Sequence, residues 1–109
     1  MSHRTLADSS FSHIVGARIE WVNIADWLFD LTSAEYQRCC PQAHIAAGVT
    51  TSDDGRPMSV NVEMIGDMLL IHNYVGEIVG PRHCRMVSTS DLFACHGRTT
   101  CHVVWDVSV

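Results

Sequence analysis

Residues 57–79 read PMSVNVEMIGDMLLIHNYVGEIV, and this stretch predicts a β-hairpin. The first half alternates as a half-buried strand does, with apolar side chains at Met58, Val60, Val62 and Met64. Gly66-Asp67 is a two-residue hairpin turn. Residues 68–79 then carry apolar side chains at both parities, which predicts a strand that is covered on both faces.

Further strands are expected on either side of this hairpin. Residues 44–51 are alternating and β-branched and lead into the turn at 53–55. After Gly80-Pro81, residues 82–95 and 99–109 form a last strand pair, with a turn at Gly97-Arg98. The second half of the chain therefore predicts an antiparallel meander.

Two short helices are expected before the meander. A helical period relates Ile24, Trp27, Leu28 and Leu31, and Asn23 is placed to cap that helix. A second helix is expected from a serine cap at Ser33 to the residue before Pro41. Ahead of both, residues 11–21 alternate and predict a first strand.

This order of elements predicts one α+β domain. We expect a curved antiparallel sheet of about six strands that grips the two helices, over residues 11–109. The 109 residues, 47% of them apolar, suffice for a single modest core. Residues 1–10 are polar and without periodicity, and we expect a flexible N-terminal arm there.

Composition excludes several classes of function. Seven basic against twelve acidic residues give a formal charge of -5, which disfavours binding to nucleic acid or to an anionic membrane. All the basic residues are arginine, so no lysine can form a Schiff base or serve a phosphate loop. No run approaches the roughly 20 apolar residues of a transmembrane helix.

Five cysteines, an odd number, follow an N-terminus without a signal-peptide run, and we expect a protein of the reducing cytoplasm without a disulfide framework. Three of them have a histidine neighbour, at His83-Cys84, Cys95-His96 and Cys101-His102. Adjacent residues on a strand point to opposite faces, so each pair offers one ligand to a given site. A three-ligand zinc site remains an alternative, but we expect neither a metal nor a cofactor.

The candidate acid–base residues are Glu63, His72 and Asp91. A carboxylate or imidazole buried in an apolar pocket has a shifted pKa and can move a proton on an enolisable carbonyl. The alternative is a solvent-facing or hydrogen-bonded structural role. Glu63 has the opposite parity to Val62 and Met64, so only one of the two sets faces a cavity.

The candidate ligand-binding residues are Trp27, Tyr74, Arg85 and Trp105. The aromatic rings among them can stack on a planar ligand, or they can simply belong to the core. His72 and Tyr74 share one face of their strand, which places a titratable group beside an aromatic wall.

Several phrases of the chain resemble one superfamily. The run IEWVNIADWLFDL at residues 19–31, followed by Glu35-Tyr36 and Pro41, resembles the opening of the START-related helix-grip superfamily, which includes polyketide cyclase/dehydrase-like proteins. The continuation is similar at VEMIG (62–66), HNYV (72–75), GRTT (97–100) and VVWDV (103–107). The resemblance implies a ligand cavity between the sheet and the helices.

Two departures from that superfamily matter. Its members end in a long helix that covers the cavity, whereas this sequence stops at Val109 and is one strand short. An open apolar groove would be a liability in a monomer, so we expect a homodimer.

The expected function is the binding of a hydrophobic, aromatic or polycyclic small molecule, with cyclase- or dehydratase-like acid–base activity. Two alternatives stay open. One is an enzyme with a cone-shaped α+β barrel like that of ketosteroid isomerase, and the other is an interaction module without catalysis.

Overall fold

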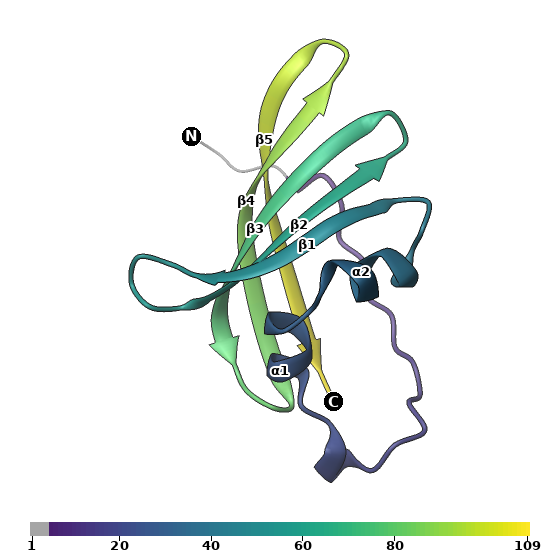
Figure 1. The fold of residues 1–109 in the computed structure, drawn as a ribbon, viewed down its shortest axis with the longest axis vertical. Coiled ribbons are helices and arrows are strands. Elements are labelled where there is room, and N and C mark those ends of the chain that lie inside the picture. The colour runs from purple at the N-terminus through teal and green to yellow at the C-terminus, as the bar shows by residue number, and fades with distance from the viewer. Residues whose placement is uncertain (1–4) are drawn as a thin grey trace.

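A computed structural model describes residues 5–109 as two short helices on one face of a five-stranded antiparallel sheet (Figure 1). The strands are β1 (His44–Thr51), β2 (Pro57–Ile65), β3 (Met68–Val79), β4 (His83–Ala94) and β5 (Gly97–Ser108). They lie in the sheet in chain order, so each pairs with its neighbours in sequence. The α+β class and the antiparallel meander are as the sequence predicts, but the described residues form five strands rather than six.

The expected first strand is the element that is missing. Residues 5–18 contain no helix or strand, and a 3₁₀ helix, η1, follows at Ile19–Trp21. It is closed locally, because the Trp21 N–H donates to the Arg18 carbonyl at 3.0 Å. Ile14 and Gly16 interrupt the alternation of residues 11–21, and Ile14 is 93% exposed. The prediction of a strand there is wrong, and residues 1–4 of the predicted arm lie outside the described residues.

Both predicted helices form. Helix α1 covers Ile24–Phe29, and the Asn23 side chain accepts the Asp26 N–H at 3.0 Å as its cap. Helix α2 covers Ser33–Cys39, and its cap is Thr32 rather than Ser33. Neither is long and apolar enough to cross a membrane, nor is any other described helix.

The turns between the strands lie where the glycines of the sequence predict them, except that the last turn is displaced along the chain. Gly66 has a φ of 62°, which suits the predicted two-residue turn between β2 and β3. The last turn is Cys95-His96, and Gly97 with Arg98 already begins β5. The turn therefore lies two residues before its predicted position.

The core lies between the helices and one face of the sheet. Ile24 and Leu28 of α1 pack with Tyr74, Cys84 and Met86 from the middle strands. On β3 the buried residues are Leu70, His72, Tyr74 and Gly76, while the residues of the other parity are half-buried as far as Val75 and exposed beyond it. No helix covers that second face in the part of the chain that the structure describes, contrary to the expectation of cover on both faces.

Candidate functional site

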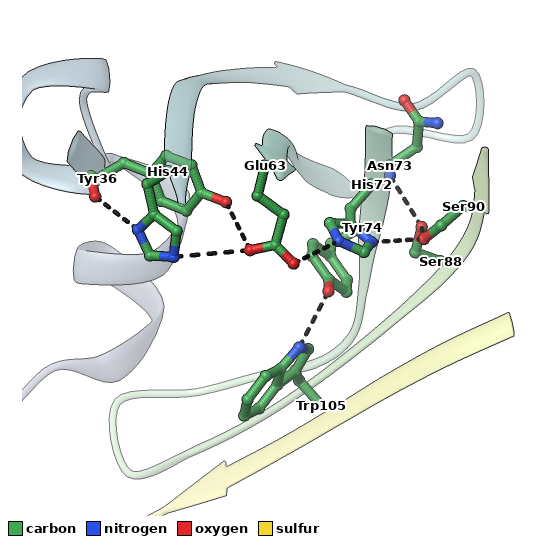
Figure 2. A network of polar contacts seen from close by, with 9 residues as sticks. All are labelled: Tyr36, His44, Glu63, His72, Asn73, Tyr74, Ser88, Ser90 and Trp105. Atoms are coloured by element: carbon green, nitrogen blue, oxygen red, sulfur yellow. Dashed lines mark hydrogen bonds and ion pairs between the residues drawn. The ribbon is translucent and has the colours of Figure 1, made fainter. Parts of the chain in front are cut away.

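Glu63 of β2 is the centre of a polar cluster that faces the helices (Figure 2). Its side chain is only 19% exposed. Tyr36 of α2 donates its hydroxyl to Oε2 at 3.2 Å, and Nε2 of His72 lies 3.1 Å from Oε1. Nε2 of His44, the first residue of β1, lies 3.6 Å from Oε2. One carboxylate therefore faces a phenol and two imidazoles.

A chain of hydrogen bonds sets the tautomer of His72. Its Nδ1 lies 2.7 Å from Oγ of Ser90, which is 2.8 Å from Oγ of Ser88. Ser88 Oγ accepts the Asn73 N–H at 2.8 Å. If Ser88 donates to Ser90 and Ser90 donates to Nδ1, every proton in the chain has an acceptor. Nε2 then carries the imidazole proton and donates it to Glu63.

His44 has the opposite arrangement. Its Nδ1 lies 2.6 Å from the backbone oxygen of Tyr36, and a carbonyl only accepts, so Nδ1 carries the proton. The ring is also stacked on Tyr36, with centroids 3.7 Å apart and planes at 1°. In the neutral ring Nε2 is therefore bare and faces Glu63.

Tyr74 adds a donor on the other side of His72. Its hydroxyl oxygen accepts the Trp105 Nε1–H at 3.0 Å, and no described residue accepts its own proton. Burial, reinforced by the Glu63 carboxylate, raises the pKa of Tyr74 to about 12. Burial and the same carboxylate also raise the pKa of Tyr36. Both phenols therefore stay protonated at neutral pH.

These groups border a cavity of about 310 Å³ between the helices and the sheet. Its apolar walls come from Trp27, Leu28, Leu31, Met86, Trp105 and Val107, and its polar lining from Tyr36, Cys39, His44, Asn61, Glu63, His72 and Tyr74. An apolar cavity with a few convergent polar groups is typical of a small-molecule site.

Five of the seven predicted site residues lie around this cavity: Trp27, Glu63, His72, Tyr74 and Trp105. Asp91 and Arg85 lie outside it, because they have the opposite parity on β4 to the buried Met86 and Ser90. Asp91 accepts from Arg98 at 2.7 and 3.0 Å, and Arg85 donates to Glu77 at 2.9 Å.

His44 and Ser90 are members of the cluster that the sequence did not single out. Counting back from the β1–β2 turn in a constant register would pair Ile45 with Glu63, and a bulge between His44 and Ala46 brings His44 there instead. No sequence signal marks that bulge. Ser90 could have been found from the pattern of β4, because His83, Arg85 and Asp91 share the other parity and leave the uncharged parity of Ser90 to face inward.

The Cys/His neighbours do not assemble a metal site within residues 5–109, where no group of three His, Cys, Asp or Glu side chains is placed to hold an ion. The cavity around Glu63 is therefore the candidate functional site.

No family model, no curated protein and no solved structure matches this chain.

Proposed function

We propose that this protein binds an aromatic small molecule with an enolisable carbonyl in the cavity and moves a proton on it. The observation that carries the proposal is the Glu63 carboxylate, which faces two imidazoles and a phenol at the edge of an apolar cavity. A volume of about 310 Å³ is at the lower end for ligand pockets, which favours one or two rings over a larger polycycle.

In this proposal Glu63 is the general base. It takes the proton from the carbon next to the carbonyl; the electron pair of that C–H bond forms a carbon–carbon double bond, and the π pair of the carbonyl moves to its oxygen. Tyr74 donates its free hydroxyl proton to that oxygen as a hydrogen bond. His72 donates to Glu63 and orients it, and Trp27 and Trp105 hold the ring. Delivery of the proton from Glu63 to a different carbon completes an isomerisation, and delivery of a proton that Glu63 has first exchanged with solvent to the original carbon completes an exchange.

The proposal extends to the fold and the compartment. The two helices and the sheet form a helix-grip fold with fewer elements than usual, as the resemblance to the START-related superfamily implies. The location of the cavity between the helices and the sheet supports this relationship. All five cysteines are free, which fits a reducing compartment such as the cytoplasm.

A bicyclic ketone, 1-tetralone, tests the proposal directly. Its C2 protons exchange for deuterium in D2O when a base removes them, and NMR follows the loss of their signal. We expect the wild type to accelerate the exchange and Glu63→Gln to lose about 10²- to 10⁴-fold of that rate. Quenching of tryptophan fluorescence by the ketone should be similar for both proteins, since Trp27 and Trp105 are unchanged.

Asp91→Asn is the matched control, because this carboxylate lies outside the cavity and pairs with Arg98. It should exchange the ketone at the wild-type rate. Binding without exchange by the wild type would leave a carrier and remove the acid–base step. Absence of binding, together with a ligand-free mass in native mass spectrometry, would favour the interaction module.

A further inference from the structure

The two edges of the sheet differ in their protection. At the β1 edge, Ser33 of α2 donates to the Ala47 carbonyl at 2.8 Å and accepts the Ala47 N–H at 2.9 Å. Gln37 donates to the Ile45 carbonyl at 2.6 Å. A bulge also bends this strand. Side chains of α2 thus occupy the outward backbone groups of β1 and close that edge to another strand.

The β5 edge has none of these protections. Its twelve residues pair with β4 in an unbroken register from Gly97 to Ser108. The strand contains no proline and no lysine, and no described side chain bonds to its backbone. Long edges without a bulge or a covering side chain are templates for pairing with another chain.

The backbone groups that face this free edge belong to the even-numbered residues. The Val109 N–H donates to the Arg82 carbonyl at 3.0 Å, so odd-numbered residues here point their backbone groups toward β4. The direction alternates along an antiparallel strand, so the groups of Thr100, His102 and Val104 point outward. The two-residue turn at Cys95-His96 leads to the same assignment of outward-facing residues, because the residues that flank such a turn are hydrogen-bonded to each other.

We propose that β5 pairs antiparallel with β5 of a second copy of this chain, with His102 opposite itself on the two-fold axis. In this register Arg98 lies opposite Asp106, and Thr100 lies opposite Val104. The pairing is argued from the backbone and charges of β5, and it stands whether or not the cavity performs the proposed chemistry.

Charge selects this register over its neighbours. A shift of two residues puts Arg98 opposite Val104 or Ser108 and leaves its charge without an opposite partner. A shift of one residue places residues whose backbone groups face the second copy opposite residues whose backbone groups face their own β4. The hydrogen bonds between the two copies are then lost. Arg98 already pairs with Asp91, and Asp106 pairs with Arg85 at 3.5 Å, so the dimer joins two ion-pair networks across the axis.

The pairing also covers exposed apolar side chains. Val104 is 42% exposed and Trp105 46% exposed. In the dimer Thr99 of the second copy lies opposite Trp105, which lines the cavity. The two sheets become one continuous sheet, and each cavity borders the other subunit.

A cross-linking experiment tests the register. Cys101 lies opposite Val103 of the second copy in a non-hydrogen-bonded pair, where the Cα atoms are about 4.5 Å apart and within the range of a disulfide. Oxidised Val103→Cys should form a covalent dimer, and peptide mapping should join position 103 to Cys101. Thr99→Cys is the matched control, because position 99 lies opposite Trp105 and far from Cys101.

A second variant tests the association itself. His102→Pro removes an outward N–H at the axis and leaves the ladder to β4, which uses the odd-numbered residues, intact. Light scattering should show a dimer for the wild type and for His102→Ala. For His102→Pro we expect dissociation about 10- to 100-fold easier, from the loss of two hydrogen bonds.

Three results would overturn the proposal. These are a monomeric wild type, a His102→Pro variant as dimeric as His102→Ala, and a disulfide map in another register. Hydrogen exchange of the backbone amides tests the alternative that a segment of the same chain, rather than a second copy, covers the β5 edge. A monomer with protected amides at Thr100, His102 and Val104 would mean that a segment of the same chain covers the edge.

Discussion

His44 and Glu63 face each other across the β1–β2 pair, with Nε2 of His44 3.6 Å from Oε2 of Glu63. From Thr51 back to Ala46 the pairing keeps one register, and the bulge between Ala46 and His44 shifts it. Without that shift Ile45 would lie opposite Glu63. A local irregularity of the backbone therefore supplies the second imidazole of the cluster.

The first prediction is that His44 and His72 are opposite tautomers when both rings are neutral. His44 donates from Nδ1 to a carbonyl, whereas His72 donates from Nε2 to Glu63. Long-range ¹H–¹⁵N correlation spectra distinguish the two forms by which nitrogen carries the proton. Two rings in the same tautomer would contradict the proton arrangement around Glu63.

The second prediction concerns Ser90, which is fully buried and positions His72 rather than touching a ligand. Ser90→Ala leaves Nδ1 of His72 without its partner, which should cost about 1–3 kcal/mol of unfolding free energy. The spectra of His72 should then show a mixture of tautomers, and ketone exchange should slow. Thr89→Ala, on the exposed face of β4, is the control and should change none of these. A purely structural role would lower stability without moving the tautomer.

The third prediction is a loss of stability in alkali. Burial raises the pKa of Tyr74 to about 12, against about 10 for an exposed tyrosine, and the pKa of Tyr36 is raised as well. A raised folded-state pKa adds stability below the unfolded value, and that stability is lost as the pH rises from about 10 to 12.

Tyrosinate absorbance at 295 nm checks this prediction, because Tyr36 and Tyr74 are the two tyrosines of the sequence. The folded protein should show little tyrosinate at pH 10, and ionisation should coincide with unfolding followed by circular dichroism. Tyr74→Phe should lessen the alkaline loss of stability. Ordinary titration with a midpoint near pH 10 in the folded protein would contradict the burial of these phenols.

The hairpin at residues 57–79 was predictable because its signals are local. Alternation and the glycine turn at Gly66-Asp67 suffice to bound β2 and β3. The same alternation over residues 11–21 predicted a strand that the structure lacks. A period shows which side chains share a face, but it does not show that a neighbouring strand is available to pair.

Parity shows which candidate residues share a face of a strand, but it did not decide which face of β2 or β3 points toward the helices. On β2 the polar set with Glu63 faces the helices and the apolar set with Val62 and Met64 faces away, whereas β3, which carries His72, is apolar at both parities. On β4 the side chains of His83, Arg85 and Asp91 share one parity, and the other parity carries no charged residue, so the sequence does contain a signal that Asp91 points outward and Ser90 inward. His44 depended on a bulge, which has no signature in the sequence.

The last prediction concerns the packing of α1 on the sheet, which depends on Gly76 of β3. A Cβ atom there would lie 2.6 Å from Cγ2 of Val79 and 3.0 Å from Cζ of Phe29 in α1. Gly76→Val should therefore push α1 from the sheet and lower the unfolding free energy by about 1–3 kcal/mol in urea titrations. Gly48→Ala on β1 is the control, since its Cβ meets nothing within 4 Å. If both variants unfold at the wild-type urea concentration, α1 does not pack on β3 as described. Because α1 carries Trp27, that result would also remove one wall of the cavity.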